Sequence, residues 1–151
     1  MKANPMLLDA ASYRFSYDMP TRFSDIDLQN HLNNTRIGEF YQEGRVRFFN
    51  GLVDAKKMQR PDWLRVLVAN IDINYLAEVN YPQIVSMKLA IAKLGRTSIT
   101  LQMAMFSEGR CAGLANVVIV IGNEQGTAPI PDDWRAALTD YLLPAEALKN
   151  N

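Results

Sequence analysis

A short polar segment, residues 23–34, carries the side chains of this chain that are best suited to chemistry. It contains Asp25, Asp27, Gln29 and His31, and His31 is the only histidine of the chain. A carboxylate or an imidazole can move a proton or attack an electrophilic carbon. Side chains of these types also satisfy loop amides and cap helices, so a purely structural turn is the competing interpretation.

The spacing of Asp25, Asp27 and Gln29 superficially follows the start of an EF-hand calcium loop. That loop needs glycine at its sixth position and a bidentate glutamate at its twelfth. The chain has Asn30 and Arg36 at those positions, which argues against calcium. One cysteine and a single histidine cannot complete a soft-metal site, so we expect no metal.

The elements around the polar segment must position it. Apolar residues recur at three- and four-residue spacing over residues 34–50, which predicts an amphipathic helix with Asn33 as its N-cap and Gly51 as its stop. The first amides of a helix lack internal partners and lie at the positive end of its dipole. They can polarise a carbonyl while a nearby carboxylate attacks or activates water, so acyl transfer is the chemistry that this arrangement suits.

Four residues inside the predicted helix need an explanation of their own. Gly38 and Gly44 each cost about 1 kcal/mol relative to alanine, and we attribute both to close approach of the helix to a sheet. Glu39 and Glu43 lie one turn apart. We interpret them mainly as partners of neighbouring arginines, with Glu43 the better candidate for a functional role.

Alternating apolar and polar residues predict strands over residues 13–17, 67–75, 84–94, 99–105 and 111–122. Short connections that contain glycine favour an antiparallel meander, and Asp132 could cap a short helix near the C-terminus. We therefore predict an α+β fold in which one sheet of about five strands curls over one long helix, as a single domain over residues 1–151. Such a sheet leaves its edges open, which favours a homodimer or a dimer of dimers.

The charge balance and the hydropathy of the sequence argue against several classes of function. Lys+Arg and Asp+Glu number 16 each, and the sequence pI is about 6.6. This balance argues against broad capture of nucleic acid or anionic membrane surfaces. The first residues lack the apolar core of a signal peptide, and the most apolar run, residues 117–121, is too short to span a membrane. We expect a cytoplasmic protein without membrane insertion.

The sequence Asp25-Ile-Asp27-Leu-Gln29-Asn-His31-Leu-Asn33-Asn34 resembles the signature of hotdog-fold acyl-CoA thioesterases of the 4-hydroxybenzoyl-CoA thioesterase-like group. That signature is approximately D-x-D-x-x-G-H-V-N-N-x-x-Y. Two weaker similarities, at residues 94–99 and 129–134, extend the resemblance over almost the whole chain. It implies a hotdog fold and hydrolysis of acyl-CoA, or of an acyl carrier protein thioester, without a metal or organic cofactor.

The resemblance also implies catalytic roles. Asp27 falls on the family's catalytic carboxylate, which acts as nucleophile or general base. Asn34 falls where a backbone amide polarises the thioester carbonyl, and His31 matches a frequent family histidine. Gln29 stands where similar plant enzymes have asparagine. Asn30 replaces the usual glycine, a mild departure if its φ is positive.

The resemblance further suggests residues that bind substrate. Arginine suits coenzyme A phosphates through its forked donors, which makes Arg96 a candidate, with Thr97 and Ser98 beside it along a pantetheine channel. The remaining candidates would line the acyl site near the helix start: Asn33, Ile37, Glu43 and Tyr75. Two other functions stay open, a non-catalytic acyl-CoA or acyl-carrier binding module and a hotdog hydratase or dehydratase. The Asn33–Asn34 pair favours the thioesterase.

Overall fold

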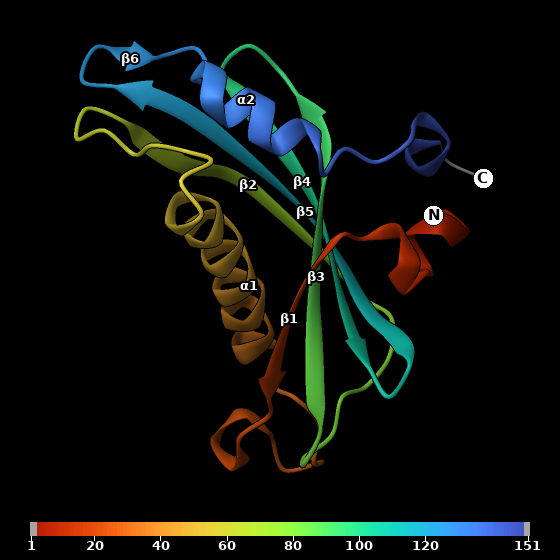
Figure 1. The fold of residues 1–151 in the computed structure, drawn as a ribbon. Coiled ribbons are helices and arrows are strands. Elements are labelled where there is room, and N and C mark those ends of the chain that lie inside the picture. The colour runs from red at the N-terminus through yellow and green to blue at the C-terminus, as the bar shows by residue number, and fades with distance from the viewer. Residues whose placement is uncertain (1–2, 150–151) are drawn as a thin grey trace.

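The computed structural model describes residues 3–149, in which a curled antiparallel sheet holds one long helix against its concave face (Figure 1). The helices are α1 and α2, and four short 3-10 turns accompany them. The predicted α+β hotdog architecture is confirmed. The elements are α1 (Asn34–Asp54), α2 (Asp132–Thr139), β1 (Phe15–Pro20), β2 (Arg65–Tyr75), β3 (Ile84–Leu94), β4 (Ser98–Ser107), β5 (Arg110–Asn123) and β6 (Gly126–Thr127).

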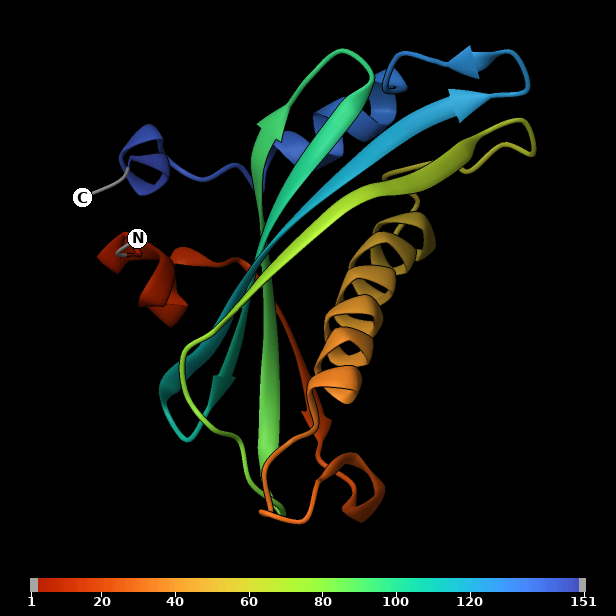
Figure 2. The same ribbon diagram turned by 180° about the vertical axis from the view of Figure 1, so that it is seen from behind.

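The strand order is β1-β3-β4-β5-β2, with the short β6 beside β5, and every pair is antiparallel. The predicted meander is right for β3, β4 and β5, which follow one another. It is wrong for β2, which pairs with β5 at the far edge (Figure 2). The link over residues 76–83 is long enough to carry the chain from that edge back to β3, so adjacency in sequence does not become adjacency in the sheet.

Helix α1 begins where predicted, but it ends at Asp54 and so continues past its predicted end at Gly51. Leu52 is buried in the core, so the last turn is held by packing, and Lys56 takes a left-handed φ of 59° shortly after the helix. Gly44 confirms the close-approach prediction, since a Cβ there would lie 3.0 Å from Cβ of Met87. Gly38 does not, because a Cβ there would meet nothing within 4 Å.

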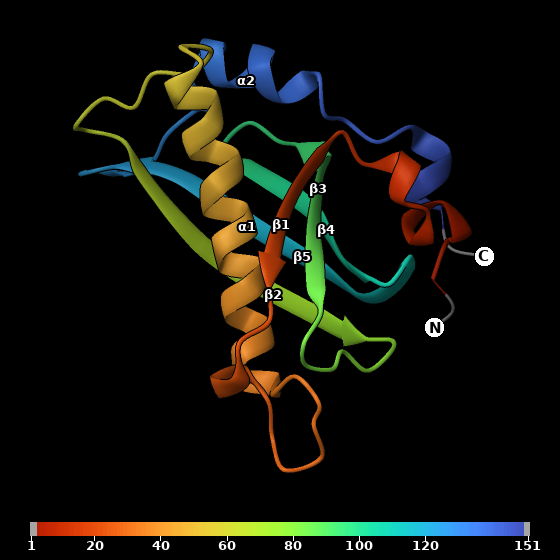
Figure 3. The ribbon, with the colours of Figure 1, turned by 60° about the horizontal axis from the view of Figure 1, so that its bottom comes forward.

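Helix α2 packs near the C-terminal end of α1, away from the polar segment (Figure 3). Trp134 is buried, stacks on Phe49 at 5.8 Å between ring centroids, and donates from Nε1 to the Gln59 carbonyl at 2.6 Å. The predicted cap is wrong: Asp132 is the first residue of the helix, and Pro131 occupies the N-cap position without a side-chain hydrogen bond.

The two edge strands of the sheet differ in length and in how much of their apolar surface is exposed. Strand β1 is six residues long and ends at Pro20, whereas β2 is eleven residues long. Four apolar side chains of β2 are exposed by 45% to 63% of their surface: Leu67, Val68, Ile71 and Tyr75. Among the described residues, no helix has the length and apolar character needed to cross a membrane.

Candidate active site

Asp25 is a buried structural residue of the polar segment. Its carboxylate accepts from the backbone N–H of Arg22 at 2.8 Å and from the Arg22 guanidinium at 2.9 Å. Its carbonyl accepts from the N–H of Asn33 at 2.8 Å, which ties the segment to the start of α1. Burial alone would raise the pKa of Asp25, but the hydrogen bonds and charge of Arg22 hold it below its ordinary value.

Asp27 is exposed and caps a tight turn of its own. Its Oδ1 accepts from the backbone N–H of Gln29 at 2.9 Å and of His31 at 3.1 Å. Asn30 lies in this turn with a φ of 61°, the left-handed geometry that asparagine tolerates. The N–H of His31, and then that of Gln29, lower the pKa of Asp27, so this carboxylate is ionised at neutral pH.

The imidazole of His31 contacts a carboxylate from another part of the chain. Its Nε2 lies 3.1 Å from Oε2 of Glu78, in the link after β2. Asn80 holds the same turn from that link by donating from Nδ2 to the Asn30 carbonyl at 2.8 Å. The side chain of Gln29 makes no hydrogen bond within residues 3–149, so the structure gives it no orienting contact.

The start of α1 has the cap that the sequence predicts. Oδ1 of Asn33 accepts from the backbone N–H of Thr35 at 3.0 Å. The backbone N–H of Asn34, the first residue of the helix, has no acceptor in the described part of the chain. A free amide at the positive end of a helix dipole therefore follows the Asp27 turn directly.

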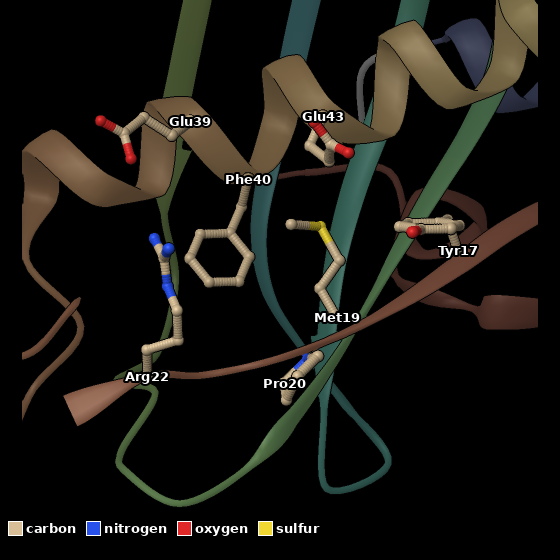
Figure 4. Close-up of a pocket in the computed structure, with 7 residues that line it drawn as sticks. All are labelled: Tyr17, Met19, Pro20, Arg22, Glu39, Phe40 and Glu43. Carbon is tan, nitrogen blue, oxygen red and sulfur yellow. The ribbon is translucent and has the colours of Figure 1, made fainter. Parts of the chain in front are cut away.

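Ile37 is half-buried and packs against the main core. Glu43 accepts from Nε of Arg47 at 2.9 Å, the intrahelical pair predicted for it, and also lines a pocket of about 380 Å³ between α1 and β1 (Figure 4). Met19 and Phe40 provide apolar walls of that pocket. It lies on the β1 side of the helix, whereas the Asp27 turn contacts the link after β2.

The remaining predicted residues lie at different ends of the sheet. Tyr75 ends β2 and is 54% exposed. Residues 96–98 lie at the β3–β4 turn, at the opposite end of the sheet from the polar segment (Figure 1). The Arg96 carbonyl accepts from the N–H of Ile130 at 2.9 Å, which fixes this turn to the segment before α2. A single chain therefore does not join Arg96, Thr97 and Ser98 to the helix start.

Sequence reasoning missed Glu78, Asn80 and Arg22, which hold the polar segment in place. Glu78 and Asn80 lie in an irregular link whose path the sequence pattern does not define. Arg22, three residues before Asp25, has an ion-pair spacing that could have identified it. Within residues 3–149, no three His, Cys, Asp or Glu side chains gather into a group that could hold a metal ion.

Comparisons with known proteins show which family the chain belongs to. The model of the thioesterase-like superfamily matches residues 21–138. Comparison with curated protein sequences gives no match. Among solved structures, a predicted thioesterase from Bacillus stearothermophilus is 25% identical, with a TM-score of 0.74 over 87% of this chain and 98% of its own.

Two further structures have the same fold. The PA5185 protein from Pseudomonas aeruginosa is 28% identical, with a TM-score of 0.74 over 91% of this chain and 97% of its own. A thioesterase from Thermus thermophilus, complexed with coenzyme A and Zn, is 19% identical, with a TM-score of 0.72 over 93% of this chain and 98% of its own. The family match covers most of the chain, including the polar segment and α1. The chain belongs to the thioesterase-like superfamily and is a thioester hydrolase.

Proposed function

We propose that the protein hydrolyses acyl-CoA thioesters, with Asp27 as the reacting carboxylate and the Asn34 amide as the electrophilic group. One observation carries this proposal: an ionised carboxylate sits in the turn that leads directly into a helix whose first N–H is free. The coenzyme A bound to the Thermus thermophilus thioesterase supports coenzyme A as the carrier. An acyl carrier protein carries the same pantetheine thioester and is the alternative carrier.

The properties of Asp27 favour nucleophilic attack over general base catalysis. A carboxylate whose pKa is held low by backbone amides is a weak base at neutral pH but remains fully ionised. It would attack the thioester carbon, the Asn34 N–H would stabilise the oxyanion, and coenzyme A would leave as the thiolate. Water would then hydrolyse the acyl-aspartate anhydride. His31, oriented by Glu78, and Gln29 are the side chains of this turn available to position water.

We also propose a homodimer in which β2 of one chain pairs with β2 of a second. This strand has one free edge and exposed apolar side chains, which pairing would cover. Antiparallel pairing would put the Tyr75 end of one β2 beside the Arg65 end of the other. In each chain Arg65 pairs with Gly122, and Ser98 pairs with Val120 on the same stretch of β5.

The dimer would therefore bring the β3–β4 turn of the second chain toward the Asp27 turn of the first. This places Arg96, Thr97 and Ser98 where coenzyme A could pass, a placement that one chain does not achieve. Asn33, Ile37 and Tyr75 would line the acyl site from the first chain. The Glu43–Arg47 pair, on the other side of α1, takes no part in the proposed site.

A thiol-release assay over short, long and aromatic acyl-CoA esters tests the function, with Asp27→Ala as the variant. Release by the wild type and a loss of about 10³-fold in the variant are expected. An absence of release from every thioester would favour the binding module. Release without loss in Asp27→Ala would exclude this carboxylate. Single turnover in H₂¹⁸O tests the covalent route, since ¹⁸O in Asp27 requires water to attack the Asp27 carbonyl carbon of the anhydride and therefore supports it. Rapid-quench mass spectrometry that finds no acyl adduct on Asp27 and no ¹⁸O in it would favour general base catalysis.

A further inference from the structure

Two polar groups on α1 are buried without a partner. Arg45 is 9% exposed, and its NH1 has no acceptor within residues 3–149. Tyr41 is 1% exposed, and its hydroxyl is also unpartnered there. Buried charges in proteins are normally paired and buried hydroxyls normally hydrogen-bonded, because both lose their hydration on folding. This loss of hydration lowers the pKa of Arg45 and raises that of Tyr41. Within residues 3–149, both groups therefore lack the partner that buried polar groups normally have.

The two groups continue the helix face that starts at the free amide. Asn34, Gly38, Tyr41 and Arg45 are spaced four, three and four residues apart, so they share one face of α1. Tyr41 places this face toward β5 and β2, since its Oη would lie 2.7 Å from a Cβ on Gly113, the residue that pairs with Tyr75. Gly38 leaves open space on the same face. A group bound at the Asn34 amide could therefore extend past Gly38 toward Tyr41 and Arg45.

Within residues 3–149, no carboxylate forms an ion pair with Arg45. The residues of β2 that point to the same side of the sheet as the core residues of β5 are all uncharged: Val66, Val68, Ile71, Ile73 and Tyr75. The carboxylates of α1 nearest to Arg45 in sequence are Glu39 and Glu43, which pair with Arg36 and Arg47 on the β1 side. A second copy of β2 would present the same uncharged residues, so the proposed dimer interface does not supply a carboxylate from this strand.

We propose that Arg45, together with the Tyr41 hydroxyl, binds a carboxylate at the far end of the acyl group. The preferred substrates are then thioesters of dicarboxylic acids. The inference rests on the proposed function and adds a substrate class to it. A guanidinium binds a carboxylate through paired N–H donors, and a tyrosine hydroxyl can donate a further hydrogen bond.

The helix sets the length of such an acyl group. At 1.5 Å per residue, Tyr41 lies about 10 Å along the axis from Asn34, and Arg45 about 16 Å. Helical side chains lean toward the N-terminus, so the Arg45 guanidinium reaches back toward Tyr41. A dicarboxylic chain of medium length, such as suberoyl, suits this span better than a malonyl or succinyl group.

Paired substrates provide the test: suberoyl-CoA and octanoyl-CoA, which differ only in the terminal carboxylate. The ratio of their kcat/KM values should favour suberoyl-CoA in the wild type and fall about 30-fold in Arg45→Met, the loss typical of a buried charge contact. Arg47→Met makes the same substitution on the β1 side and should keep the wild-type ratio. Tyr41→Phe, which retains the aromatic packing, should lower the ratio by a smaller factor and serves if Arg45→Met does not fold.

Binding gives a second measurement. Calorimetry with Asp27→Asn, which blocks turnover, should show tighter binding of suberoyl-CoA than of octanoyl-CoA, and Arg45→Met in that background should remove the difference. Equal kcat/KM values in the wild type, or a ratio that Arg45→Met and Tyr41→Phe both leave unchanged, would overturn the inference while the hydrolase proposal stands. An absence of thiol release from either substrate would instead count against the proposed function.

Discussion

The two sides of α1 differ in whether their charged and polar side chains are paired and exposed. On the β1 side, Glu39 pairs with Arg36 and Glu43 with Arg47, and these side chains are between 40% and 56% exposed. On the β2 side, Arg45 and the Tyr41 hydroxyl are buried and have no partner in the described part of the chain, and the neighbouring strand exposes apolar side chains. The charges on the β1 side are paired within one chain, whereas the buried polar groups on the β2 side have no partner among residues 3–149. An incomplete side is where a second chain and a substrate are expected.

On the β2 side, Ile71→Lys should have the largest effect, because it should disrupt the proposed β2–β2 dimer. Ile71 lies on the helix-facing side of β2 but is 45% exposed in the single chain, so the substitution replaces no fully buried residue and puts a charge into the proposed dimer interface. We expect a monomer and a loss of hydrolysis of about 100-fold, because an unpaired charge at an interface is costly. Light scattering and thiol release measure both effects.

Ser16→Lys adds the same charge to β1, whose Ser16 side chain is exposed, and should leave mass and rate unaltered. A dimer in both variants would contradict pairing through β2. A monomeric wild type would contradict the dimer altogether.

Asp25 connects the two sides of α1. Its partner Arg22 lines the pocket on the β1 side, and its own carbonyl accepts a hydrogen bond from Asn33 at the start of the helix. Asp25→Ala should lower the free energy of unfolding by about 2 kcal/mol, since a buried charge-assisted hydrogen bond is lost. The folded pKa of Asp25 is lowered, so its stabilisation is present above the unfolded pKa and is lost as pH falls through the folded value. Urea unfolding of both proteins between neutral and acidic pH should show their stabilities converging as pH falls; a constant gap would argue against the ion pair.

The pH dependence of hydrolysis tests whether Asp27 is the essential carboxylate. Because backbone amides lower the pKa of Asp27, the acid limb of kcat/KM should lie below the ordinary aspartate value of about 3.9. Circular dichroism at each pH separates this limb from unfolding. An acid limb above the ordinary aspartate value, in folded protein, would indicate a different essential group.

Glu43→Gln should have the smallest effect. The Glu43–Arg47 pair is exposed, and such pairs contribute at most about 1 kcal/mol and often much less. Hydrolysis should change by less than about twofold, because the carboxylate lies outside the proposed site. A large loss of kcat with an unchanged melting temperature would instead place the chemistry in the pocket between α1 and β1.

The sequence predicted the features whose causes are local. Asn33 caps α1 because its neighbours are the first free amides, and Asn30 takes a positive φ because the tight turn requires it. Gly44 was explained correctly by helix–sheet contact. The helix C-terminus at Gly51 was wrong because burial of Leu52 outweighs the local preference of glycine.

Features that depend on distant parts of the chain could not be predicted. Glu78 meets His31 only because the link after β2 runs beside the polar segment, and no periodicity in the sequence predicts such a path. Arg96 and the Asp27 turn lie at opposite ends of the sheet in one chain, and no sequence pattern reports which edge of the sheet a second chain covers. Gly38 and Gly44 could not be told apart from the sequence, because both are glycines inside the same predicted helix. Only the structure shows that Gly44 faces the sheet and Gly38 does not.

Pro20, at the end of β1, has a consequence for how far assembly can proceed. In the proposed dimer both β2 edges are used, and the merged sheet ends in two copies of β1. Each is six residues long and ends in a residue without an N–H donor, a poor template for another strand. The merged sheet should therefore stop growing at two chains rather than extend into an open-ended polymer, and the protein should stay dispersed at high concentration.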